Sequence, residues 1–202
     1  MTRRTFVVIA DAVRRSPLAD YRERFVGLSA ATRGEVLLRE VPYLAQVNFR
    51  ADSNDASIMQ RLASTLGFAL PAVPNTVISE GDRRSLWLGP DEWLLVGPDG
   101  TQDTLQDALR VGLAGAFGSI VDVSANRTLL EIGGTKARDV LVHGVPIDLH
   151  ARSFGPGRCA QTLLAKAQVI VERRDESAFV LYVRASFAGY AADWLLDSSS
   201  GG

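Results

Sequence analysis

Apolar and polar residues follow short regular patterns from residue 44 onward. Residues 44–50, LAQVNFR, alternate between the two kinds, which is typical of a strand with one buried face. In residues 51–67, four apolar side chains recur at helical spacing and share one face: Met59, Leu62, Ala63 and Leu66. Asp52 or Ser53 can cap the start of this helix, and Gly67 can end it. The pattern therefore predicts a strand followed by an amphipathic helix.

The stretch SLWLGPDEWLLVG, residues 85–97, predicts a hairpin. Two short apolar strands, 85–88 and 92–96, are separated by Gly89-Pro90-Asp91, which suits a type I turn. A second amphipathic helix over 103–115 and a strand over 119–124 follow. The first half of the chain thus has the predicted order β-α-β-β-α-β.

The second half repeats this order of elements without repeating its residues. We expect a strand at 127–132, a helix over 136–144 that Thr135 can open, a strand pair within 159–174, a strand at 177–184 and a helix at 187–197. Split β-α-β halves of this kind form ferredoxin-like units. We therefore predict an α+β fold of duplicated ferredoxin-like β-α-β-β-α-β units.

The predicted domain organisation is simple. A single α+β domain over residues 26–197 contains two pseudo-repeats, at about 37–124 and 127–197. Residues 1–25 are predicted to be an extended arm, because they are rich in arginine and Pro17 favours an extended Ser16. Residues 198–202 are predicted to be a flexible tail.

Composition and charge narrow the classes of function. The net charge is −1, so no basic excess is available for nucleic-acid phosphates. Cys159 is the only cysteine, which excludes an internal disulfide and a cysteine-based metal site. No segment approaches the roughly 20 apolar residues of a membrane span, and the apolar run at 6–10 is too short for a signal core. We expect a cytoplasmic protein that binds neither nucleic acid nor membrane.

The hairpin carboxylates Asp91 and Glu92 invite an acid/base interpretation. Neighbouring side chains of a strand point to opposite faces, so the two cannot both address one substrate without a bulge. We expect turn and surface roles for them. Trp87 and Trp93 are either core residues or a rigidly presented contact surface, since tryptophan is frequent in both settings.

Other candidate sites also lack the spacing that chemistry requires. EIGGTKARD, residues 131–139, has Thr135 before Lys136, the reverse of a phosphate loop, and predicts a tight strand-to-helix turn instead. His143 and His150 are too few for a metal site. Cys159 is expected to be an inert core residue. We therefore assign no catalytic, cofactor-binding or metal-binding residue, and expect a structural ion pair between Asp122 and Arg127 at the joint of the two halves.

Six stretches taken together resemble one known family: RSPL (15–18), SLWLGPDEWLL (85–95), VDVSANRT (121–128), ARDVL (137–141), DLHARSFGPG (148–157) and RASF (184–187). In this order and spacing the chain resembles the gamma subunit of bacterial heterotetrameric sarcosine oxidase, from about residue 15 to residue 194. The combination of the GPDEW hairpin with SANRT and FGPG is the most specific part. Thr135 departs from the family, which often has proline at this position.

The resemblance implies a fold related to the folate-binding domain of the glycine-cleavage T-protein. It also implies an enzyme complex that oxidatively demethylates sarcosine to glycine, with hydrogen peroxide and either formaldehyde or 5,10-methylenetetrahydrofolate as further products. In that family the alpha and beta subunits hold FAD, FMN, NAD and tetrahydrofolate, the delta subunit holds zinc, and the gamma subunit is not known for a cofactor of its own. The expected partners are therefore alpha, beta and delta subunits.

We expect this chain to be a non-catalytic subunit that packs on the alpha subunit through its N-terminal arm and its hairpin. The candidate interface residues are Arg15, Ser16, Pro17, Leu18, Trp87, Pro90, Asp91, Glu92 and Trp93. Three alternatives remain open. They are a free-standing folate-binding aminomethyltransferase-like protein, the iron–sulfur-repair relative of the same fold, and a binding module with another partner. The second alternative is weakened because GPGRCAQT, residues 155–162, lacks the K-G-C-Y-x-G-Q-E motif of that group.

Overall fold

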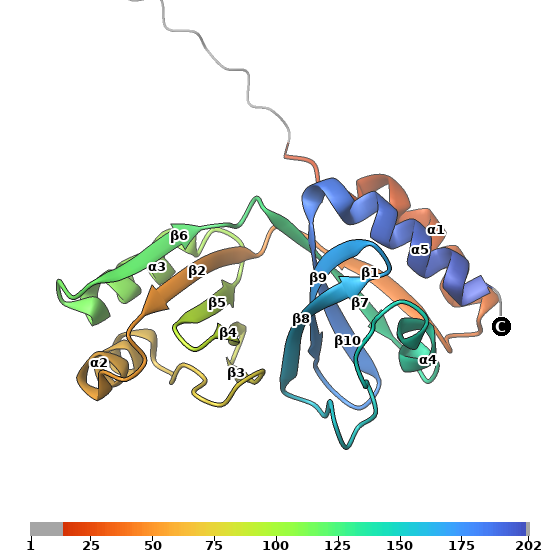
Figure 1. The fold of residues 1–202 in the computed structure, drawn as a ribbon. Helices are drawn as coiled ribbons and strands as arrows, with labels where there is room; N and C mark the ends of the chain where they lie inside the picture. The colour runs from red at the N-terminus through yellow and green to blue at the C-terminus, as the bar shows by residue number, and fades with distance from the viewer. Residues whose placement is uncertain (1–13, 201–202) are drawn as a thin grey trace, which may run out of the picture.

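The computed structural model describes residues 14–200, which form two antiparallel five-stranded sheets (Figure 1). The first sheet has the order β3 (Val77–Glu80), β4 (Arg83–Gly89), β5 (Glu92–Gly97), β2 (Ala45–Ala51) and β6 (Gly118–Asp122). The second has the order β8 (Arg158–Leu164), β9 (Ala167–Arg173), β10 (Ala178–Arg184), β7 (Arg127–Gly133) and β1 (Leu37–Val41). The predicted α+β class is confirmed.

The two strand orders correspond position by position, as expected of a duplicated unit. The sheets differ at one edge strand. In the first sheet this strand is β6, from the end of the first unit, and in the second sheet it is β1, which precedes both units in the sequence. Residues Leu37–Val41 pair with β7, from Leu37 opposite Gly133 to Val41 opposite Leu129. The predicted first repeat is therefore wrong at its start, since its first strand completes the other unit. A five-residue strand of mixed polarity carries no signal for which sheet it joins.

Helices cover the outer faces of the sheets, and the inner faces meet each other (Figure 1). α2 (Ala56–Leu66) and α3 (Gln102–Leu113) pack on the first sheet. α1 (Arg22–Ala31), α4 (Ala137–Val142) and α5 (Ala188–Ser200) pack on the second. A third apolar cluster fills the contact between the sheets and consists of Leu86, Leu94, Val96, Leu129, Cys159, Ile170, Val180 and Tyr182.

Helix α2 shows how local sequence fixes an element. Asp55 caps it by accepting hydrogen bonds from the N–H groups of Ser57 and Ile58, so the predicted caps Asp52 and Ser53 are wrong by a few residues. Asp52 instead accepts a bond from the N–H of Asn54 and shapes the preceding turn. Gly67 ends the helix at a φ of 80°, as predicted.

The N-terminal prediction of an extended arm is wrong for the part that the structure describes. A short 3-10 turn, η1 (Ala19–Tyr21), leads directly into α1. Leu18 and Phe25 are 1% and 4% exposed and belong to the core of the second sheet. Only Phe25 and Leu28 of α1 are buried, so the segment lacks the periodicity that would have revealed a helix. Residues 1–13 lie outside the described part.

The C-terminal prediction also needs correction, because α5 continues to Ser200 and includes part of the predicted tail. Residues 201–202 lie outside the described part. η2 (Ala185–Phe187) joins β10 to α5. Within residues 14–200, no helix combines the length and apolarity needed to cross a membrane.

Candidate subunit interface and buried polar network

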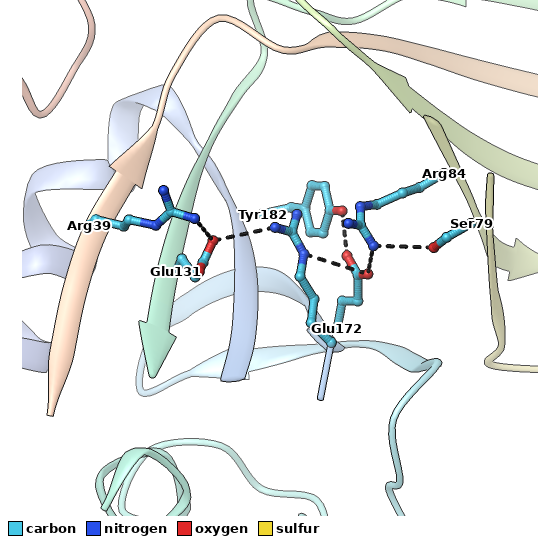
Figure 2. Close-up of polar contacts among 7 residues, drawn as sticks. Arg39, Ser79, Arg84, Glu131, Glu172 and Tyr182 are labelled. Carbon is cyan, nitrogen blue, oxygen red and sulfur yellow. Dashed lines mark hydrogen bonds and ion pairs between the residues drawn. The ribbon is translucent and has the colours of Figure 1, made fainter. Parts of the chain in front are cut away.

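A buried carboxylate joins the two sheets. Glu172 of β9 is 1% exposed, and its Oε2 accepts a hydrogen bond of 2.6 Å from the hydroxyl of Tyr182. Its Oε1 accepts a bond of 3.0 Å from Nη1 of Arg84, which comes from β4 of the first sheet (Figure 2). Both oxygens of this buried charge are therefore satisfied, and one of the bonds crosses between the sheets.

The same network continues to the surface along the second sheet (Figure 2). Arg174 donates from Nη1 to Glu131 at 3.3 Å, and its Nε lies 3.8 Å from Glu172. Glu131 also accepts a 2.8 Å bond from Arg39, its cross-strand neighbour on β1. Arginine and glutamate side chains thus alternate along the network, each in contact with the next, as expected of a structural network.

Two further groups in this region are held in their protonated forms. Burial, and then the charge of Glu172, raises the pKa of the Tyr182 hydroxyl well above its usual value. The same two causes raise the pKa of Cys159 to about 12. Its thiol is buried and lies 3.5 Å from the carbonyl oxygens of Thr76 and Trp87. Cys159 is a core residue, as predicted, and carries little thiolate at neutral pH.

The hairpin forms as predicted, but its two tryptophans have different roles. Trp93 is 1% exposed, stacks on Phe49 with ring centroids 5.8 Å apart, and donates from Nε1 to the carbonyl of Pro71 at 2.9 Å. Its place among the candidate interface residues is therefore wrong. Trp87 is partly exposed, and with Pro90 it lines a groove of about 610 Å³. The groove is also lined by Pro71 and Pro74 of the Pro-rich connector, residues 69–75 between α2 and β3.

The hairpin carboxylates contact the same arginine and do not converge on an open site. Glu92 accepts hydrogen bonds from Asn48 at 2.7 Å and from Arg50 at 2.5 Å. Asp91 is exposed and lies 4.0 Å from Arg50. A bulge between Trp87 and Gly89 bends the hairpin before its turn. The expected turn and surface role fits this geometry.

The N-terminal candidate interface residues also include both buried and exposed side chains. Ser16 is buried and donates to Glu40, which also accepts a bond from Thr128. Ser16 and Leu18 therefore attach the segment to its own domain and are not available to a partner. Arg15 and Pro17 are exposed, with Arg15 paired to Asp20.

The predicted ion pair between Asp122 and Arg127 is not among the ion pairs of residues 14–200. Asp122 accepts bonds from the N–H and hydroxyl of Ser124 and so stabilises the turn that follows β6. Arg127 begins β7 and lies opposite Arg184, the last residue of β10. Arg184 is not among the candidates predicted from the sequence, although the stretches SANRT and RASF contain these two arginines.

The remaining candidate motifs have structural roles. Gly134 adopts a φ of 102° at the tight turn predicted for EIGGTKARD, and Lys136 pairs with Glu35 at 2.9 Å. His150 accepts a bond from the N–H of Arg152. Among the described residues, no group of three or more His, Cys, Asp or Glu side chains has the arrangement of a metal site.

Comparison with known proteins gives one consistent family. Residues 50–201 match the model of the sarcosine oxidase, gamma subunit family. The chain is 35% identical to sarcosine oxidase subunit gamma of Arthrobacter sp over 193 residues, which cover 95% of this chain and 93% of that protein. The protein of the same name from Corynebacterium sp. (strain P-1) is also 35% identical, over 96% of this chain and 94% of its own length.

Solved structures agree with this result. A chain of the heterotetrameric sarcosine oxidase from Corynebacterium sp. U-96, solved in complex with pyrrole 2-carboxylate, matches with a TM-score of 0.83 and 36% identity, covering 94% of this chain and 96% of that one. The aminomethyltransferase T of Bartonella henselae matches with a TM-score of 0.66 at 14% identity over 93% of this chain and 58% of that one, which shows a shared fold alone. The predicted relation to the aminomethyltransferase fold is thereby confirmed, and the chain belongs to the sarcosine oxidase gamma subunit family.

Proposed function

We propose that this chain is a non-catalytic subunit of a heterotetrameric oxidase that demethylates sarcosine to glycine, with hydrogen peroxide and formaldehyde or 5,10-methylenetetrahydrofolate as the other products. Its role is to stabilise the assembly by packing on the alpha subunit. The observation that carries the proposal is the match along 94% of the chain to a protein of a heterotetrameric sarcosine oxidase.

The polar groups of the chain support a role in assembly. Both oxygens of the buried Glu172 carboxylate accept hydrogen bonds, from Tyr182 and Arg84. Glu131 accepts hydrogen bonds from Arg39 and Arg174. A general acid or base must reach a substrate atom, and these groups reach each other instead. The thiol of Cys159, with its raised pKa and complete burial, is a poor nucleophile.

The resemblance to a folate-binding fold makes the contact between the two sheets a candidate folate site. The side chains there are at most 3% exposed, and they include Leu86, Leu94, Ile170 and Tyr182. A tightly packed apolar contact does not fit a pterin ring with its several hydrogen-bonding groups. We therefore propose that the folate of the complex binds in another subunit. The family resemblance gives the same expectation for the flavins, NAD and zinc.

Co-expression with and without this chain tests the proposal. The alpha, beta and delta candidates of the same organism are produced with the wild-type chain or without it, and sarcosine-dependent hydrogen peroxide production is measured together with the size of the complex. We expect this chain to co-purify and its omission to reduce the yield of assembled oxidase. Full assembly and activity without it contradict the proposal.

The leading alternative, a free-standing folate-binding aminomethyltransferase-like protein, is tested on the isolated chain. Titration with tetrahydrofolate, followed by tryptophan fluorescence, is expected to show no saturable change, because the contact between the sheets is filled. Saturable binding by the isolated chain favours the alternative.

A further inference from the structure

Two arginines face each other at one end of the second sheet. Arg127 of β7 lies directly opposite Arg184 of β10, so both side chains start from the same face. The next pair, Asn126 and Ala185, is joined by a backbone hydrogen bond of 2.9 Å from the Ala185 N–H. In an antiparallel ladder the neighbouring pair is then of the non-hydrogen-bonded kind, in which opposite side chains lie closer together.

Neither guanidinium has a partner within residues 14–200, where neither forms a hydrogen bond, an ion pair or a ring contact. Burial, and then the charge of Arg184, lowers the pKa of Arg127. Glu92 acts on Arg127 only at a distance and is itself bonded to Asn48 and Arg50. Like charges directly opposite on a sheet are destabilising. This pair therefore costs the isolated chain stability.

The arginines line an open pocket of about 330 Å³. The side chains of Gln161, Thr162 and Gln168 also line it, and Gln161 is fixed by its 2.9 Å bond to the carbonyl of Leu88. One exposed apolar side chain also lines the pocket, since Leu163 is 40% exposed. Arginine is enriched at the residues that dominate protein contact sites.

We propose that Arg127 and Arg184 form a socket for an Asp or Glu side chain of a partner subunit. One carboxylate can accept hydrogen bonds from two guanidinium groups, and its charge removes the repulsion between them. The exposed Leu163 adds an apolar contact that a small anion would not use, which fits a protein partner. The inference rests on the proposed function, because it requires a partner subunit.

The test uses the co-expressed complex with Arg127→Gln, Arg184→Gln and the double variant. Arg110→Gln is the matched control, since Arg110 is an exposed arginine on α3 with 57% of its side chain accessible. We expect the double variant to raise the dissociation constant of this chain from the complex by about tenfold or more and the control to leave it unchanged. The free double variant should unfold at an equal or higher urea concentration than wild type. An unchanged dissociation constant, or a free chain that is clearly less stable, overturns the socket.

Two further results separate the possible occupants. Free wild-type chain is titrated with acetate and succinate while the Arg Nε–Hε signals are followed by NMR, and we expect no saturable binding. Saturable binding that Arg127→Gln abolishes, with assembly unaffected, assigns the pocket to a small carboxylate and overturns the proposal. A wild-type chain that fails to assemble contradicts the proposed function itself, whereas equal assembly of wild type and variants contradicts only the socket.

Discussion

Arg84 of one sheet donates a 3.0 Å hydrogen bond to the Glu172 carboxylate of the other, and Glu172 is almost completely buried. Removing the arginine leaves a buried charge with fewer partners. We expect Arg84→Met to lower the free energy of unfolding by about 2–4 kcal/mol. Urea denaturation of the wild-type chain and the variant measures this difference in the free energy of unfolding.

A double-mutant cycle separates this bond from other effects of the substitution. Glu172→Gln removes the charge, so adding Arg84→Met to it should cost much less than Arg84→Met costs alone. Equal costs in the two backgrounds would show that Arg84 and Glu172 do not interact.

The two tryptophans of the hairpin provide a matched pair. Trp93→Ala removes a buried ring that stacks on Phe49, and we expect a loss of about 3–5 kcal/mol in stability. Trp87→Ala removes a partly exposed ring and should cost about 1 kcal/mol or less in stability. Comparable losses in thermal unfolding experiments would refute the assignment of Trp93 to the core and Trp87 to the surface.

The turn between β7 and α4 depends on Gly134. A Cβ there would lie 2.3 Å from the carbonyl oxygen of Glu35, at a φ of 102°. We expect Gly134→Ala to cost about 2 kcal/mol or more, since both the contact and the dihedral angle are unfavourable. Gly100→Ala is the control, with a φ of 78° and open space around its Cβ. Equal urea midpoints for the two variants would contradict this role of Gly134.

The reactivity of Cys159 depends on pH through its raised pKa of about 12. The thiol ionises near pH 9 when unfolded and near 12 when folded, so its contribution to stability is complete below pH 9 and decreases as the pH rises towards 12. At pH 8 we expect a disulfide reagent such as DTNB to label the native chain only as fast as it unfolds. Labelling at the rate of a free thiol in native buffer would contradict the burial.

Much of the fold was predictable because its elements are local. The hairpin, α2 and α3 follow from apolar periodicity and turn residues, and each lies within a few residues of where these patterns place it. Strands β1 and β3 were not predicted. Leu37–Val41 mixes apolar and charged residues, and β3 is only four residues long with no buried residue.

The candidate interface was less predictable, because burial is a tertiary property. Leu18 is a candidate as part of the predicted N-terminal arm and Trp93 as an aromatic residue of the hairpin, but both are core residues in the folded chain. Arg127 and Arg184 belong to two strands, β7 and β10, between which α4, β8 and β9 lie in the sequence. Only the strand register, which the sequence patterns do not specify, brings them together.

The most direct test of the account is native mass spectrometry of this chain purified from its own cells, with an absorption spectrum of the same sample. We expect a flavin-coloured complex in which the 21.8 kDa chain is present once, together with two larger chains and one smaller chain. A colourless species at 21.8 kDa without other chains would contradict it.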